Sequence, residues 1–463
     1  MRDVQAVGEK KSDWINRLDG FFEGKIYPLL VCLLVLVGHI TSLELWLSIP
    51  NVVLVAVALV RAKSIRPFIP FACTLIFSVS VKYGPGTPSY SDYYFTGYRL
   101  PIVIILFLII FGAMGYYAVK NRIFRDINLL KTPLLLPLII LSVAFLLNGA
   151  FSPTWDVSDL LLGCCEALIY TVLFLFFYFA IREEKKEELI DYVIYVSGTI
   201  ALLLILECAA LFITTDGIFE GGSIVKEKVL LGWGLWNTIG VCLTVLIPVL
   251  FLGYLRSRYG GLYLMLATLT LLCAALTQSR NAIIFGSVVY VICLGISLFY
   301  GKRRLWTLTF VGLLLVVAGL ADTFLGGKIT ALLGDVLSRG FSDNGRFDLW
   351  GQGIDNFLSY PIFGKGFFTT VSDSANFLPT MVHQTFIQFL SAMGIFGLLA
   401  YLYYRVSSAI PLFRKPSLEK TMLALSIGVL LAESLLDNFI FYFIPIIYYS
   451  LILAIIHRDS WES

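Results

Sequence analysis

Long apolar runs, separated by short charged connections, dominate the pattern of this chain. A helix that crosses the hydrocarbon core of a membrane needs about 20 apolar residues, and fourteen runs approach that length. Because the runs are continuous rather than alternating, they predict helices and not the strands of a barrel. The expected spans are 26–42, 43–60, 67–81, 100–118, 132–150, 159–181, 190–213, 234–254, 260–277, 281–299, 305–322, 384–404, 421–437 and 439–457.

Composition agrees with this pattern. Of the 463 residues, 58% are hydrophobic and 14% are charged, whereas roughly a quarter of the residues of a soluble protein are charged. We therefore expect an all-α, polytopic membrane helical bundle of about 12–14 transmembrane helices, with one large helical loop outside the membrane. The expected division is into N-terminal transmembrane helices (1–233), a core (234–404) that contains the loop 323–383, and C-terminal transmembrane helices (405–463).

Lysine and arginine are unevenly divided between the two sets of connections. The set that includes the N-terminal tail and Arg458 holds 25 of the 34, and the other set holds the remaining nine. Because positive residues concentrate in cytoplasmic connections, we expect the first set and both termini in the cytoplasm. The net charge of +3 then reflects topology, so no nucleic-acid partner is expected. The eight cysteines fall inside apolar runs and are expected to be packing thiols.

The stretch Leu325–His383 is the longest run that cannot lie in lipid, and it is expected to face outward. Within it, Ile329–Leu337 predicts a short amphipathic helix. Ser342–Gly345 predicts a turn that begins a second helix at Arg346, and Pro361 follows the end of that helix.

Arg346 is therefore expected in the first turn of a helix. A cation there opposes the helix dipole, unless the side chain and the free N–H groups share an anion. The alternative is a solvated arginine beside Asp343 or Asp348.

Acidic residues interrupt several apolar runs on the outward side. Charges within the membrane are costly and usually face a polar cavity, so these residues suggest a hydrated cavity that opens beneath the loop. The alternatives are side chains that reach the membrane surface and hydrogen bonds between helices. The residues concerned are Glu166, Glu207, Glu433 and Asp437, with His39 at the end of the first span.

Three residues on the outward side are candidates for chemistry: Arg280, Arg346 and His383. Arginine binds phosphate oxygens with a planar fork and stays charged when it is partly desolvated. A neutral histidine can take a proton from an attacking hydroxyl near neutral pH. Two fixed cations and one imidazole at a membrane surface suit a reaction on a phosphate-bearing lipid.

Several catalytic signatures are missing from the chain: Asp-x-Asp, His-Glu-x-x-His, Gly-x-Ser-x-Gly and the phosphate-binding Gly-x-x-x-x-Gly-Lys. A glycosyltransferase that uses nucleotide sugars is expected to work in the cytoplasm, often with a metal on paired carboxylates. A lipid-diphosphate donor fits an outward site better. Two arginines could neutralise the leaving diphosphate, so neither a metal nor another cofactor is expected.

With these residues the chain resembles the O-antigen ligase and polymerase superfamily of bacterial envelope glycan enzymes. The resembling block runs from about Trp236 to Ala400 and includes Asn237 near its start. Its shared pieces are Ser279-Arg280-Asn281-Ala282, Gly345-Arg346-Phe347-Asp348-Leu349-Trp350, Tyr360-Pro361-Ile362-Phe363-Gly364-Lys365-Gly366, His383-Gln384-x-x-Ile387 and Gly394-Ile395-Phe396-Gly397.

The resemblance implies a bundle of the GT-C type in the bacterial cytoplasmic membrane. It implies metal-independent transfer of glycan from an undecaprenyl (polyprenyl) diphosphate carrier to a hydroxyl of a glycan or lipid-linked acceptor outside the cytoplasm, by a ligase or a polymerase. Arg280 and Arg346 would hold the donor diphosphate, and His383 would activate or orient the acceptor. Two positions depart from the common pattern, Gln384 in place of Asn and Asn281 in place of Gly.

Further residues are candidates for substrate contact. Arg99, Arg339 and Lys365 could add positive potential over the donor, with lipid headgroups as the alternative partner. Asn237 matches an asparagine that often opens the helix before the Ser-Arg step, and Trp350 could stack on a sugar ring or anchor at the interface.

A transporter or flippase of lipid-linked oligosaccharide is the alternative function, because it would also need an outward polar cavity and cationic side chains. The chain lacks a pair of similarly interrupted helices in its two halves, and its polar features lie on one face.

Overall fold

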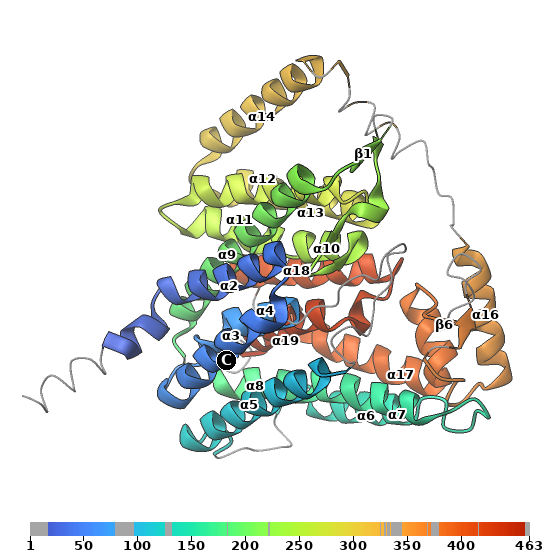
Figure 1. The fold of residues 1–463 in the computed structure, drawn as a ribbon. Coiled ribbons are helices and arrows are strands. Elements are labelled where there is room, and N and C mark those ends of the chain that lie inside the picture. Colours follow the sequence, from blue (N-terminus) through green and yellow to red (C-terminus); the bar gives the residue numbers. More distant parts are fainter. Residues whose placement is uncertain are drawn as a thin grey trace, which may run out of the picture. The chain divides into compact units, whose positions relative to one another are not determined.

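The structure, a computed structural model, describes residues 17–78, 97–125, 132–182, 184–220, 223–324, 326–327, 330, 334, 345–367, 369–371, 379–414 and 416–458. Helices dominate these residues (Figure 1), so the predicted all-α membrane bundle is confirmed. Chain contacts divide the protein into two compact units, each built from separate stretches. The first unit is Met1–Asp126, Phe179–Thr215 and Glu227–Ile239, and the second is Ile127–Tyr178, Asp216–Lys226 and Gly240–Ser463.

In the first unit, α2 packs against α3, α4 and α9, and α3 packs against α5. The turn between α2 and α3 is tight because Gly38 lies against the Glu44 backbone, where an added Cβ would be 3.2 Å from Cα. A short hairpin packs on α9. The elements are α2 (Ile26–Thr41), α3 (Glu44–Arg61), α4 (Phe68–Ser78), α5 (Arg99–Lys120), α9 (Lys186–Thr214), η4 (Lys226–Lys228), β3 (Leu230–Leu231) and β4 (Gly234–Leu235).

The second unit holds the remaining elements, and α8, η4 and α10 each contain residues of both units. In it, α11, α12 and α13 lie side by side, and α16 lies along α17 (Figure 1). The elements are α6 (Leu135–Leu146), α7 (Val157–Ala167), η3 (Leu168–Leu173), α8 (Phe174–Ala180), β1 (Phe219–Glu220), β2 (Ser223–Ile224), α10 (Trp236–Thr244), α11 (Ile247–Arg256), α12 (Gly260–Leu276), α13 (Arg280–Tyr300), α14 (Arg304–Phe324), α16 (Arg346–Ser359), β5 (Thr370–Val371), β6 (Pro379–Thr380), α17 (Thr385–Phe413), α18 (Leu418–Ser434), η6 (Phe439–Phe441) and α19 (Phe443–Arg458).

Every predicted span contains a helix, but the helices differ in length. Among the described residues, eight are long and apolar enough to cross a membrane, or nine if the bent pair Arg17–Glu23 and Ile26–Thr41 is one span. The sequence count of about 12–14 spans also included shorter helices such as α6 and α12. The run that contains α6 is shortened because Pro133 and the left-handed Leu134 precede the helix.

Three glycines allow the backbones of neighbouring segments to approach each other closely. These contacts hold the segment that follows α16 against α17. Gly149, Gly364 and Gly394 have φ values of +62°, +70° and +64°. The Gly149 N–H donates to the Phe363 carbonyl at 2.9 Å, and a Cβ on Gly394 would lie 2.4 Å from the Ile362 carbonyl oxygen. Only glycine fits such positions without strain, so these contacts seat the segment that follows α16.

We expect Gly394→Ala to destabilise the protein by about 1–3 kcal/mol, because alanine adds a methyl group where backbone already lies and disfavours the positive φ. Gly112→Ala in α5 is the control, since a Cβ there meets nothing within 4 Å; it should leave stability unchanged or raise it by about 1 kcal/mol. Thermal unfolding of the purified protein in detergent measures both. Equal melting temperatures for the two variants would contradict the proposed role of Gly394 in backbone packing.

Candidate active site

A break between α18 and α19 positions a buried carboxylate. Helix α18 ends at Ser434, and the side chain of Asp437 in the turn that follows is only 3% exposed. The Asp437 N–H donates to the Glu433 carbonyl at 3.1 Å, and the Asn438 N–H donates to Asp437 Oδ1 at 2.8 Å. The Thr385 hydroxyl donates to the Ser434 carbonyl at 2.6 Å and joins the start of α17 to this break.

His383 immediately precedes α17 and has a φ of +52°, a conformation that is uncommon for a residue other than glycine. Its neighbours are held on both sides. The Gln384 side chain caps α17 by accepting from the Ile387 N–H at 2.6 Å, and the Gln388 side chain accepts from the Val382 N–H at 2.7 Å. This segment turns the imidazole toward the α18–α19 break, where Nδ1 lies 2.8 Å from Asp437 Oδ1.

Arg346 approaches the other oxygen of the same carboxylate. It is the first residue of α16, after the left-handed Gly345, and its Nη2 atom lies 4.0 Å from Asp437 Oδ2. The side chains of His383 and Arg346 are 34% and 27% exposed, so both can meet a ligand. We name these three residues the His383–Asp437–Arg346 cluster. The sequence alternative that paired Arg346 with Asp348 differs from the contact observed, and Asp343 lies outside the described residues.

The environment of His383 shifts its proton affinity. Burial lowers the pKa of the imidazole, whereas the charge of Asp437 and the hydrogen bond to it raise the pKa, and Arg346 opposes them. The net result is a pKa above the usual histidine value. More of the imidazole is therefore protonated at a given pH than in an isolated histidine.

Arg280 is the first residue of α13, and α10 packs against the start of that helix. Gly240 of α10 packs against Ser279 and Ala282, where an added Cβ would lie 2.6 Å from the Ala282 side chain. One turn later, the Thr244 hydroxyl donates to Glu433, which is one turn before Asp437. Residues 240–244 of α10 therefore contact both the start of α13 and the last turn of α18.

Trp350 lies one turn after Arg346 on α16. Its ring meets the Phe347 ring edge to face, with centroids 5.2 Å apart. The indole Nε1 is buried and has no hydrogen-bond partner within the described part of the chain. Within the described residues, this donor close to Arg346 therefore has no protein partner.

Lys365 belongs to the segment that the glycines seat against α17. Its own N–H donates to the Ser391 carbonyl at 2.8 Å, and the flanking N–H groups of Gly364 and Gly366 donate to the carbonyls of Tyr360 and Ala392. These amides are occupied, so they do not form a cradle for a phosphate. The half-buried side chain of Lys365 remains a candidate contact.

The other candidates from the sequence belong to the first unit or lie outside the described residues. Arg99 begins α5 in the first unit, with its guanidinium 4.9 Å from the Tyr98 ring centroid. Asn237 is half-buried in the first turn of α10, also in the first unit. Arg339 and the turn before Gly345 lie outside the described residues, as does most of the predicted helix Ile329–Leu337.

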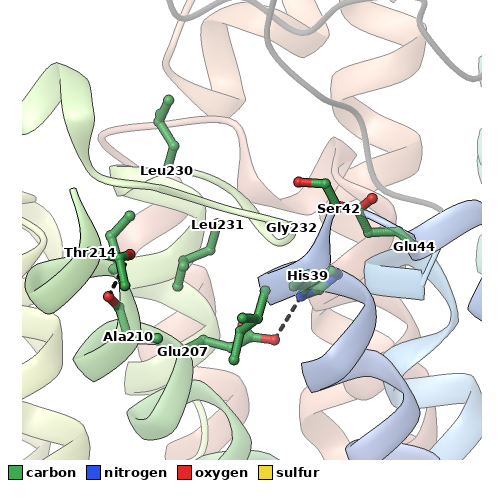
Figure 2. A pocket seen from close by; sticks show the side chains of 11 residues that line it. His39, Ser42, Glu44, Glu207, Ala210, Thr214, Leu230, Leu231 and Gly232 are labelled. Carbon is green, nitrogen blue, oxygen red and sulfur yellow. Dashed lines mark hydrogen bonds and ion pairs between the residues drawn. The ribbon is translucent and has the colours of Figure 1, made fainter. Parts of the chain in front are cut away.

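The first unit has a polar pocket of its own, of about 440 Å³. Figure 2 shows His39 and Glu207 facing each other at its base, with Nδ1 and Oε1 2.7 Å apart. The Trp233 indole donates to the other Glu207 oxygen and is buried, so it neither anchors at an interface nor offers an open ring. The described lining residues include Glu44 and Glu207 but no lysine or arginine, so the pocket would repel a diphosphate.

The acidic residues that interrupt apolar runs therefore do not gather around one cavity. Glu207 pairs with His39 in the first unit, whereas Glu433 and Asp437 lie in the second unit and Glu166 is buried there. His, Cys, Asp and Glu side chains of the described residues form no group of three that could hold a metal ion. The partnership of Asp437 with His383 was missed from the sequence, and the only available signal was an acid near the end of an apolar run.

Comparison with known proteins adds one match. Residues 262–402 match the family model described as O-antigen ligase, whereas no curated protein matches the chain. The matched range contains Arg280, Arg346 and His383 but ends before Asp437. Residues 262–402 are thus an O-antigen ligase domain, in a chain whose described helices include eight that are long and apolar enough to cross a membrane, and this domain supports a membrane enzyme that ligates or polymerises glycans.

Proposed function

We propose that the protein transfers glycan from an undecaprenyl (polyprenyl) diphosphate-linked donor to an acceptor hydroxyl on the outer face of the bacterial cytoplasmic membrane. The observation that carries this proposal is the His383–Asp437–Arg346 cluster, which combines a base, its partner and an anion-binding cation within contact distance. The core 234–404 supplies the base and both arginines, and the C-terminal helices supply Asp437.

His383 acts as the general base in this proposal. With its Nδ1–H donated to Asp437, the imidazole presents Nε2 as the proton acceptor, and the carboxylate stabilises the imidazolium that forms. The acceptor hydroxyl gives its proton to Nε2 while its oxygen attacks the anomeric carbon of the donor sugar. The bond from that carbon to the diphosphate oxygen breaks, and the lipid diphosphate leaves with the electron pair.

Arg346 and Arg280 hold the diphosphate. The 4.0 Å contact between Arg346 and Asp437 is longer than a hydrogen bond, so most guanidinium donors of Arg346 remain for phosphate oxygens. Two cations stabilise the charge that develops on the leaving group, which makes the reaction metal-independent in this proposal. Trp350, Lys365, Asn237, Arg339 and Arg99 are proposed further contacts to glycan or headgroup.

The sidedness of the reaction rests on the distribution of 25 of the 34 lysine and arginine residues in one set of connections. The cluster belongs to the other side, which we assign to the exterior. A flippase of lipid-linked oligosaccharide would need its cations exposed to both sides in turn. A histidine paired with a buried carboxylate suits proton removal from an acceptor hydroxyl, which favours group transfer.

His383→Ala should reduce glycan transfer by about 10²–10⁴-fold, because the acceptor hydroxyl loses its base. The assay uses purified protein, a polyprenyl diphosphate oligosaccharide and candidate acceptors, with and without EDTA. His457→Ala, a buried histidine in α19, is the control for histidine removal. Unchanged turnover in His383→Ala would contradict the base role, and lipid movement across vesicles without a new glycosidic bond would favour the flippase.

The pH dependence of transfer should report the pairing with Asp437. Because the pKa of His383 is raised, its neutral form, and hence activity, should increase as pH rises through that pKa. Asp437→Asn removes the group that raises the pKa, so the acid limb of the profile should move to lower pH while the maximal rate falls by about 10²–10⁴-fold. Asp348→Asn, at an exposed position of α16, should change neither the position of the acid limb nor the maximal rate. An acid limb that stays in place in Asp437→Asn would contradict the pairing.

Arg346→Ala and Arg280→Ala should each lower transfer by about 10²–10³-fold through loss of charge stabilisation on the leaving diphosphate. Arg346→Lys should recover only part of this, because an ammonium group cannot bind two phosphate oxygens with a planar fork. Arg304→Ala, which removes an exposed arginine at the start of α14, is the charge-matched control. Wild-type rates in both alanine variants would show that the donor binds elsewhere.

A further inference from the structure

A second pocket of the first unit, of about 580 Å³, has five basic residues among its eleven described lining residues. It lies where α3 and α5 end and where the chain enters α9. Its volume is within the range of about 300–1,000 Å³ that is common for small-molecule sites. The basic residues that line it are Lys63, Lys120, Arg122, Arg125 and Arg182, and Glu184 is the one acidic residue among the described lining.

Part of this charge is used within the protein. Lys120 Nζ donates to the carbonyls of Val60 and Arg61 at 2.7 and 2.8 Å, and so caps the end of α3. Glu184 accepts from Arg66 Nε at 3.0 Å and from the Ile65 N–H, so its charge is balanced outside the pocket.

Besides Lys120, four basic residues with exposed side chains line the space: Lys63, Arg122, Arg125 and Arg182. Like charges gathered around one space repel each other, and an anion bound among them would remove that repulsion.

The backbone at Arg122 has an uncommon conformation. Helix α5 ends with the Arg122 N–H bonded to the Val119 carbonyl at 3.2 Å and the Ile123 N–H bonded to the Ala118 carbonyl at 3.1 Å. This is a Schellman motif, in which the left-handed position is usually glycine. Here that position is Arg122, with a φ of +51°. A residue other than glycine is uncommon at this position.

The pocket lies at the opposite end of α3 and α9 from the His39–Glu207 pocket. Helix α3 begins at Glu44, which lines the His39–Glu207 pocket, and ends at Arg61, two residues before Lys63. Its 18 residues span about 27 Å, close to the thickness of a hydrocarbon core. The cationic pocket is therefore at the depth of a membrane surface, and its basic connections belong to the set that we assign to the cytoplasm.

We propose that this pocket binds the phosphate of a headgroup-sized anion. Arginine and lysine from three separate segments converge on it, which suits a phosphate with oxygens pointing in several directions. The ligand can come from two sources, an anionic phospholipid of the adjacent leaflet or a soluble phosphate compound. The site does not depend on the transfer reaction proposed above.

The test uses the full-length protein in detergent. Native mass spectrometry compares retention of phosphatidylglycerol with retention of zwitterionic phosphatidylcholine, and a parallel titration uses inorganic pyrophosphate as the soluble probe. The pocket variant is Arg122→Gly with Arg182→Ala. The control variant is Arg258→Ala with Lys302→Ala, which removes the same charge from exposed positions of the second unit.

We expect the pocket variant to lose at least tenfold in affinity for one probe, while the control variant binds like the wild type. Loss of phosphatidylglycerol identifies a lipid, and loss of pyrophosphate identifies a soluble phosphate. Because glycine relieves the strain at position 122, the single variant Arg122→Gly should melt no lower than wild type while binding more weakly. If pocket and control variants bind both probes equally, the proposal is wrong.

Discussion

The structure of the candidate site depends on one buried carboxylate, that of Asp437. Burying an ionised group is costly unless partners compensate, and here each oxygen faces one: His383 on one side and Arg346 on the other. These partners come from the start of α17 and the start of α16. The single negative charge of Asp437 pairs with both side chains. It therefore brings His383 and Arg346, which are 37 residues apart in the chain, into one candidate site.

This arrangement requires that the segment after α16 returns closely to α17. Side chains would prevent that approach at Gly364 and Gly394, where backbone lies within 2.5 Å of any added Cβ. The Thr385 hydroxyl and the Gln388 amide then fix the start of α17 to its neighbours. The glycine-rich steps near Lys365 therefore act through packing, and they place the catalytic candidates indirectly.

The first unit shows how one helix group can present opposite chemistry at its two ends. Around His39 and Glu207 the polar groups are acidic or neutral, whereas around Arg122 and Arg182 they are mainly cationic. Apolar residues between the two ends match the membrane interior. Of the two ends, the cationic one therefore suits a phosphate better.

The sequence alone determined the class, the helical positions and the residue types of the site. Runs of about 20 apolar residues permit few structures besides membrane helices, and the turn before Arg346 predicted the start of α16 correctly. Arg280, Arg346 and His383 were recognisable because their local motifs are short and contiguous. Helix lengths were less predictable, since α6 begins only after a left-handed residue that the apolar pattern does not reveal.

Which residues contact Asp437 was decided only by the tertiary structure. Asp437 is 54 residues after His383 and 91 after Arg346, and no local pattern connects these positions. Their contact arises from the break after α18 and from the close backbone contacts at Gly149, Gly364 and Gly394. Both features depend on packing between segments that are distant in the chain. The same applies to the cationic pocket, because basic residues that mark topology in the sequence converge only when α3, α5 and α9 are folded.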